Sequence, residues 1–169
     1  ILKQTKNILK MDAILAYDEN GKPKEPEWPA ADVIIGNPPF LGSRKMRPEL
    51  GNEYCDALLE IYGDRIEGLP DLVCYWFEKA NCQLKDGKTK RAGLLATQAI
   101  RGGSNKQVLD HIKESGDIFF AYSDKEWILD GATVHVSMVG FDNGNDKAKE
   151  LDGFPVEKIN SDLTSDVNL

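Results

Sequence analysis

The chain has 169 residues, 41% of them hydrophobic and 29% charged, which fits one domain with an ordinary core rather than two full domains. Its formal net charge of −7 repels DNA phosphates on average, so contact with nucleic acid requires local basic patches or segments outside this sequence. No run reaches the roughly 18 apolar residues of a membrane-spanning helix, and no signal peptide is evident, so we expect a cytoplasmic protein.

The first predicted element is a short parallel strand that follows a loop. Residues 18–29 are rich in glycine, proline and charged residues, which is typical of a loop. Residues 31–35 contain the β-branched run Val-Ile-Ile, which predicts a strand covered on both faces. Pro38 and Pro39 cannot continue a ladder of backbone hydrogen bonds, so the chain must leave the sheet there.

Two helices are expected next. After a basic turn, Pro48 suits the first turn of a helix whose apolar residues recur at helical spacing as far as Ile61, and Gly63 ends it. Asp71 is expected to cap a second helix, whose apolar stripe reaches Leu84. Such a helix packs on a sheet.

Residues 92–97 predict a second buried strand. Ser104 and Gln107 have the spacing of a capping box, which predicts the start of another helix. Strands are expected at 117–122 and 133–141. The order strand, helix, helix, strand, helix, strand, strand is that of the second half of a doubly wound α/β sheet whose last two strands can pair antiparallel.

The cysteines and histidines do not form a metal-binding pattern. Cys55, Cys74 and Cys82 match no zinc spacing, and their odd number leaves no complete set of pairs. His111 and His135 are too far apart in the sequence for a histidine metal site. We therefore expect reduced thiols in or near the core, and no metal.

The main chemical signal is Asn37-Pro38-Pro39-Phe40, at the carboxyl end of the first strand, where open α/β sheets bind their ligands. The exocyclic amino nitrogen of adenine is a poor nucleophile because its lone pair is delocalised into the ring. The side-chain oxygen of Asn37 and the carbonyl of Pro38 can accept hydrogen bonds from this amino group. Its hydrogens become more acidic as the nitrogen is methylated, so both acceptors stabilise the transition state more than the ground state.

The other residues of this loop fit the same chemistry. The rings of Pro38 and Pro39 fix the backbone that carries the acceptor carbonyl. Phe40 offers a flat apolar face on which an extruded base can stack. The alternative interpretation is a simple turn with an aromatic residue in the core.

Residues 32–40 resemble motif IV of the amino-methyltransferases, which modify adenine N6 or cytosine N4. Further segments are similar, in order, to the adenine methyltransferase region of the type IIL restriction-modification fusion proteins: 70–77, 93–103, 121–127 and 131–141. The resemblance covers roughly residues 10–142. It implies a bacterial DNA adenine N6 methyltransferase with a Rossmann-like fold, which uses S-adenosylmethionine and flips its target base out of double-stranded DNA.

The resemblance also implies roles for individual residues. Trp127 matches a second aromatic residue that sandwiches the flipped base against Phe40, and Phe141 matches it less well. Asp12 resembles an acidic residue that accepts a hydrogen bond from the adenine amino group of the cofactor. Asn37 would also contact the methionine part of the cofactor.

Basic residues after the two strands are candidates for contacts with DNA phosphates, although such clusters are more often solvated surface. They are Arg44, Lys45, Arg47, Arg101 and Lys106.

One expected part of the cofactor site is missing from this sequence. The glycine-rich motif around the methionine end of S-adenosylmethionine, and the acidic residue for its ribose, should precede Ile1. We therefore expect a partial methyltransferase domain at 1–142, a linker or weakly ordered tail at 143–169, and weak or no cofactor binding by this piece alone. The remaining N-terminal part and a target-recognition domain would belong to the same protein. An exposed sheet edge would favour self-association of the isolated chain.

Two other interpretations stay open. Asn-Pro-Pro followed by an aromatic residue also occurs in enzymes that methylate RNA or the glutamine amides of proteins. The second interpretation is a non-catalytic module for DNA binding or subunit contact. Such a role does not require the intact loop from Asn37 to Phe40.

Overall fold

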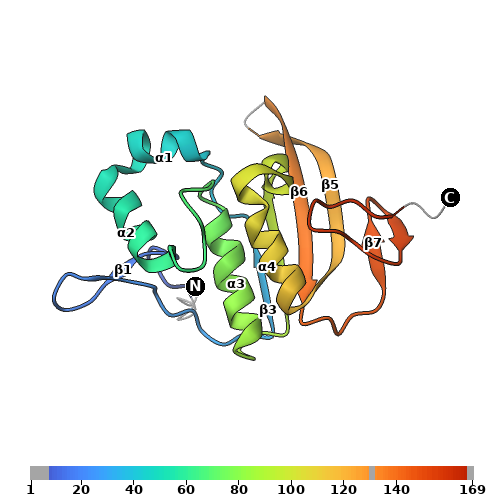
Figure 1. The fold of residues 1–169 in the computed structure, drawn as a ribbon, viewed down its shortest axis with the longest axis horizontal. Helices are drawn as coiled ribbons and strands as arrows, with labels where there is room; N and C mark the ends of the chain where they lie inside the picture. Colours follow the sequence, from blue (N-terminus) through green and yellow to red (C-terminus); the bar gives the residue numbers. More distant parts are fainter. Residues whose placement is uncertain (1–7, 130–131, 167–169) are drawn as a thin grey trace, which may run out of the picture.

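The computed structural model describes residues 8–129 and 132–166 and shows a mixed sheet flanked by helices (Figure 1). The order of strands across the sheet is β3 (Val33–Gly36), β4 (Arg91–Thr97), β6 (Ala132–Asp142), β5 (Asp117–Leu129), β7 (Lys149–Leu151) and β8 (Phe154–Val156). Strands β3 and β4 are parallel, whereas β6 is antiparallel to both β4 and β5. The expected α/β class is confirmed.

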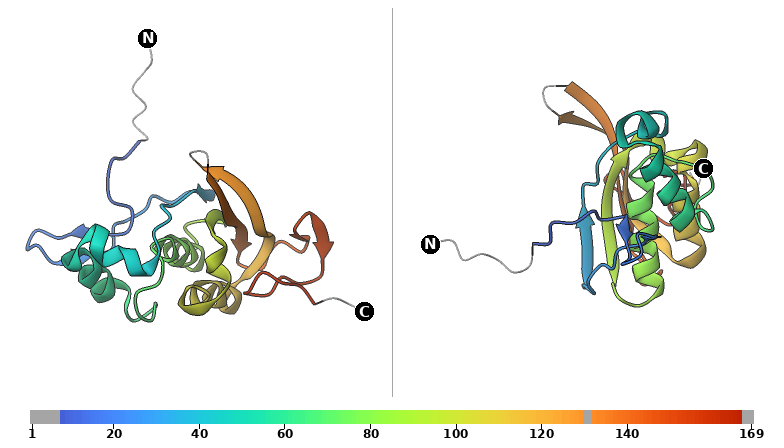
Figure 2. Two further views of the ribbon diagram at one scale, coloured as in Figure 1. Left: turned by 90° about the horizontal axis from the view of Figure 1, so that it is seen from above. Right: turned by 90° about the vertical axis from the view of Figure 1, so that its left-hand side faces the viewer.

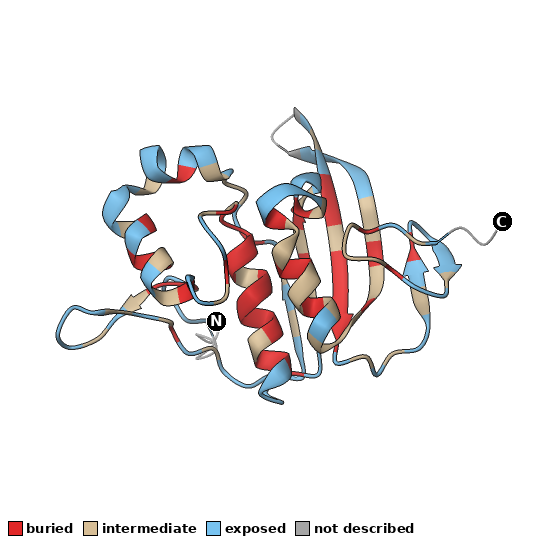
Figure 3. Ribbon diagram, viewed as in Figure 1, coloured by how far each residue is buried: buried red, intermediate tan, exposed pale blue. Residues whose placement is uncertain are grey.

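Two helices, α3 (Cys74–Lys85) and α4 (Gln107–Ser115), pack on one face of this sheet (Figure 3). Phe77 of α3 stacks on Phe141 of β6 with ring centroids 5.9 Å apart, and both side chains are fully buried. This contact lies in the main core. No helix in the described ranges is long and apolar enough to cross a membrane.

The opposite face of the sheet is open. The helices of the described chain lie on one side of the sheet (Figure 2). Ile35 on the edge strand β3 is 84% exposed, and it lines a groove of about 350 Å³ together with Leu95, Phe119 and Met138. An exposed strand edge beside an apolar surface is a site for pairing with another chain. The self-association expected for the isolated chain stays a prediction.

The helix predicted from Pro48 is in fact two helices. Helix α1 (Ser43–Leu50) starts within the predicted basic turn, and α2 (Asn52–Tyr62) follows Gly51. Gly51 has φ 88°, a left-handed conformation that glycine adopts easily and that interrupts helical geometry. The backbone conformation of a glycine cannot be inferred from the spacing of the apolar residues around it. The break between α1 and α2 was therefore not evident from the sequence.

Both predicted helix caps were wrong. Helix α3 begins at Cys74 without a side-chain cap, and the carboxylate of Asp71 instead accepts a hydrogen bond from the Ser43 N–H at 2.8 Å. Ser104 lies in the 3₁₀ helix η2 (Gly103–Asn105), where its carbonyl accepts a hydrogen bond from the Gln107 side chain. Neither the Asp71 nor the Ser104 side chain therefore caps the helix that follows it, and Asp71 instead contacts the start of α1.

The segment after Asp142 differs from the expected linker. Strand β7 pairs with β5 and β8 pairs with β7. Ile159 and Leu163 are almost fully buried, and the Arg101 guanidinium donates a hydrogen bond to the carbonyl of Asp162 at 3.0 Å. The few apolar residues in this segment are widely spaced, so their burial depends on the sheet edge that receives them.

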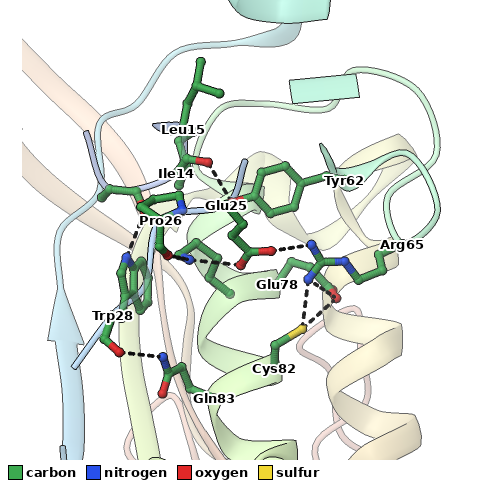
Figure 4. A network of polar contacts seen from close by, with 12 residues as sticks. Ile14, Leu15, Glu25, Pro26, Trp28, Tyr62, Arg65, Glu78, Cys82 and Gln83 are labelled. Carbon is green, nitrogen blue, oxygen red and sulfur yellow. Dashed lines mark hydrogen bonds and ion pairs between the residues drawn. The ribbon is translucent and has the colours of Figure 1, made fainter. Parts of the chain in front are cut away.

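A strap formed by residues 25–28 fixes the chain that leads to β3 (Figure 4). Glu25 pairs with Arg65 at 2.6 Å and with Lys79 at 2.9 Å. The Lys79 ammonium also donates to the Pro26 carbonyl at 2.7 Å and lies over the ring of Trp28. Only 4% of the Lys79 side chain is exposed. A buried cation with three partners thus holds the strap on α3.

The chain before the strap is fixed separately. Strands β1 (Ala16–Tyr17) and β2 (Pro23–Lys24) form a small hairpin. The Tyr62 hydroxyl of α2 donates to the Ile14 carbonyl at 2.8 Å. Burial raises the pKa of Tyr62, so this hydroxyl keeps its proton and remains a donor.

Candidate active site

The Asn-Pro-Pro-Phe loop leaves the sheet at the carboxyl end of β3. Asn37 is exposed, Pro38 is buried and Phe40 is half-buried. Gly36 lies close to β4, because a Cβ at this position would lie 3.2 Å from the Leu94 side chain. The Leu94 contact and the buried Pro38 fix the backbone that presents Asn37 to solvent.

A hollow of about 490 Å³ lies directly beside this loop. Its lining residues are Phe40, Leu41, Gly42, Ser43, Arg44, Lys45, Glu49 and Asp71. Phe40 thus borders an open space that also carries two basic residues. This arrangement supports a site at the loop rather than a turn with an aromatic residue in the core.

Trp127 lies at the same end of the sheet as the loop. It is 40% exposed, on the long hairpin formed by β5 and β6. In the sheet, Trp127 of β5 pairs with Val134 of β6. This pair lies beyond the end of β4, because the last residue of β4, Thr97, pairs with Val136. The hairpin therefore extends beyond the sheet where the parallel strands end (Figure 1). No ring contact joins Phe40 and Trp127 in the described ranges, so the two aromatic faces are separate.

Phe141, the weaker candidate for base stacking, is in the core. Its side chain is fully buried against Phe77 of α3. A base cannot reach it without unpacking the helix from the sheet. Of the two residues, only Trp127 offers an accessible aromatic face.

Asp12 has a clear local role. One carboxylate oxygen accepts hydrogen bonds from the N–H groups of Ile14 and Leu15, at 2.9 and 3.0 Å. The other accepts from the Tyr54 hydroxyl at 2.8 Å, and burial together with this carboxylate raises the pKa of Tyr54. One lone pair of the exposed carboxylate stays available to a ligand.

The fit of a cofactor to this chain is therefore partial. Asp12 can offer one more hydrogen-bond acceptor, and the exposed Asn37 can offer its amide. The hollows beside Phe40 and beside the strap are lined by neither residue. Each can make a single contact to S-adenosylmethionine, and together they do not form a cradle.

The five candidate phosphate contacts differ in their surroundings. Arg47 pairs with Asp56 at 2.7 Å and Lys106 with Asp110 at 2.6 Å, while Arg101 bonds to the C-terminal segment. Among the described residues, Arg44 and Lys45 form no ion pair. These two also line the hollow beside Phe40, which makes them the better placed candidates.

Sequence analysis missed Asn105. Only 8% of this residue is exposed, and its side chain exchanges two hydrogen bonds with Asp71. The two positions are far apart in the sequence, and nothing in the residues next to Asn105 indicates that its side chain is buried against Asp71. The described residues contain no cluster of three or more metal-ligating side chains.

Comparisons with known proteins identify the family of this chain. The family model described as MmeI, DNA-methyltransferase domain, matches residues 2–152. The DNA complex of the type IIL restriction-modification enzyme MmeI superposes with a TM-score of 0.63 and 25% identity, over 81% of this chain and 20% of that one. The type IIG restriction endonuclease BpuSI gives a TM-score of 0.46 and 9% identity, over 71% and 14%, too low to support an argument. No curated protein matches.

The family match extends over most of the chain and includes the Asn37–Phe40 loop, both parallel strands and the hairpin that carries Trp127. The chain spans about a fifth of the MmeI chain that it matches. The resemblance to the type IIL methyltransferase region is thereby confirmed. The chain belongs to the family of MmeI DNA-methyltransferase domains.

Proposed function

We propose that this chain forms the catalytic part of a site-specific DNA adenine N6 methyltransferase in a bacterial restriction-modification enzyme, which acts in the cytoplasm. The observation that carries the proposal is the exposed Asn37 at the carboxyl end of a parallel strand, next to an open hollow bordered by Phe40. Membership of a DNA-methyltransferase family supports it.

In the proposed reaction, the Asn37 side-chain oxygen and the Pro38 carbonyl accept hydrogen bonds from the two N–H groups of the adenine amino group. The nitrogen lone pair would take up the methyl group of S-adenosylmethionine, whose sulfur would keep the electrons of the C–S bond, and one amino proton would be lost to solvent. S-adenosylmethionine, when bound, supplies the electrophilic methyl group. Because the two acceptors are fixed before the reaction, they lower its barrier without reorganising.

Binding would involve residues from several elements. Phe40 and Trp127 would stack on the flipped adenine, and Arg44 and Lys45 would contact phosphates beside it. Asp12 and Asn37 would hold parts of the cofactor. Most of the cofactor pocket, and the recognition of the DNA sequence, would come from segments that this chain does not contain.

Trp127→Ala is expected to weaken base flipping much more than Ile128→Ala. Stacking on an aromatic side chain contributes about 1–3 kcal/mol per base, whereas exposed Ile128 precedes the hairpin turn on the other face of its strand. The measurement is the fluorescence of 2-aminopurine at the target position. Equal signals from both variants would remove Trp127 from the base site.

The proposal is tested by identifying the product. The complete natural protein is incubated with isotope-labelled S-adenosylmethionine and, in separate reactions, with DNA, RNA or a protein with exposed glutamines. The digested nucleosides and peptides are analysed by mass spectrometry. Labelled N6-methyldeoxyadenosine is the expected product. Labelled N4-methyldeoxycytidine would overturn the target base, and label only in RNA or in protein glutamine would support the other substrate classes. DNA binding without any transferred label would favour a non-catalytic module.

A further inference from the structure

We propose that Asp71 and Asn105 are positioning residues that hold the Asn37–Phe40 loop in its reactive position. Neither residue belongs to the proposed base or cofactor contacts. Asp71 lies just before α3, and Asn105 lies in η2, in the segment that follows β4. The inference rests on the proposed methyl transfer, since it concerns the residues that would carry out that step.

Asp71 holds the segment that follows the reactive loop. One of its carboxylate oxygens accepts a hydrogen bond from the Ser43 N–H at 2.8 Å, at the first residue of α1. Next to it, the Leu72 N–H donates to the Leu41 carbonyl at 2.9 Å. The chain that leaves Phe40 is thus tied at two consecutive points to the residues before α3.

Asn105 completes the arrangement from the other side. Its side-chain oxygen accepts from the Asp71 N–H at 2.9 Å, and its amide donates to the second Asp71 carboxylate oxygen at 2.9 Å. The same amide also donates to the Ala99 carbonyl at 3.3 Å. The loops after β3 and β4 are therefore joined through one pair of side chains.

The chemistry of the pair is specific. Both carboxylate oxygens of Asp71 accept from N–H groups, and no cation pairs with it within the described ranges. Asn105 is 8% exposed, so a hydrogen bond lost here is not replaced by bulk water. An amide at position 71 can accept from the Ser43 N–H only by turning its amino group toward the amide of Asn105. Asp71→Asn therefore puts two donors face to face.

Methyl transfer requires the two acceptors of the loop to be fixed relative to the amino group. A displacement of about 1 Å in such a site costs on the order of 100-fold in rate. Asp71 also lines the hollow beside Phe40, so the carboxylate fixes the wall of the space where the base would lie. A change at this pair should therefore lower the rate of the chemical step more than the affinity for DNA.

The test measures kcat and KM for DNA with the complete natural protein under steady-state conditions, well below its melting temperature. Asp71→Asn is expected to lower kcat roughly 10- to 100-fold, with KM for DNA changed less than about threefold. The exchanged pair, Asp71→Asn with Asn105→Asp, restores a donor opposite an acceptor between the two side chains and keeps the net charge, but it leaves the Ala99 carbonyl without its donor, so it should recover part of the rate. Asn105→Asp alone places two carboxylates face to face and should not.

Two further variants test whether a loss of rate comes from displacement of the loop or from a general effect of losing the charge. Ser43→Pro replaces the N–H that donates to Asp71 with a ring carbon, which displaces the carboxylate, at a helix position where the proline backbone is tolerated and after Gly42 at φ −68° and ψ 148°. It should lower kcat in the same direction as Asp71→Asn. Asp86→Asn removes the same charge at the exposed far end of α3 and should leave kcat unchanged.

The outcomes are distinct. An unchanged kcat for Asp71→Asn and Ser43→Pro, or an exchanged pair that regains thermal stability but not the rate, would overturn the positioning role. A wild-type protein that transfers no methyl group to DNA would refute the proposed function and this inference with it. Loss of rate in the single variants with recovery in the exchanged pair supports the assignment.

Discussion

Asn37→Ala is expected to lower the rate of methyl transfer by roughly 10²- to 10³-fold or more, because it removes one of two fixed acceptors for the charge that develops on the amino group. The Asn37 side chain is exposed and forms no hydrogen bond with other described residues, so the fold should not depend on it. The measurement is the single-turnover rate of the complete natural protein, with DNA affinity followed by fluorescence anisotropy.

The control for this variant is Asn145→Ala, the same substitution at an exposed position in the turn before β7. It should leave both the rate and the DNA affinity unchanged. Substantial turnover by Asn37→Ala would contradict the proposed mechanism. Loss of DNA binding in step with the rate would instead show that Asn37 serves binding rather than the chemical step.

Lys79→Ala is expected to lower the free energy of unfolding by about 3 kcal/mol, the lower end of the cost of breaking a buried ion pair. The loss is moderated because Glu25 keeps its pair with Arg65. Burial lowers the pKa of Lys79 and Glu25 acts against this shift. Removing the cation also frees the Pro26 carbonyl and the face of Trp28.

The measurement is hydrogen exchange, followed by mass spectrometry in peptides that cover the strap and β3. Faster exchange is expected there first, since the strap delivers the chain to β3. Lys88→Ala is the control, because its ion pair with Asp86 is more than half exposed and contributes little. Equal protection of the strap in both variants would show that Lys79 does not hold it.

Local patterns predicted the elements that surround the loop. The β-branched run before Asn37 became β3, and residues 92–97 fall within β4 (Arg91–Thr97). The apolar stripe from Leu72 to Leu84 became the buried face of α3. These elements were predictable from the periodicity of apolar residues and from residues that end a strand. Both can be recognised in a short stretch of sequence.

Contacts between distant segments decided what these patterns could not. The same strand periodicity fits Trp127 and Phe141, but only packing against α3 shows that Phe141 is buried and Trp127 accessible. Strands β7 and β8 exist because the edge of β5 receives them. A lysine in a helix is expected at the surface, but the tertiary structure places the strap over Lys79 and buries it.

By itself the sequence determined the chemistry of the loop, because Asn37, Pro38 and Phe40 are adjacent and their order fixes which groups follow the strand. Only the tertiary structure decided what we propose holds that loop, because Asp71 and Asn105 are 34 residues apart in the chain and meet only in the folded protein. Hydrogen bonds between residues far apart in the chain depend on a geometry that no local pattern specifies.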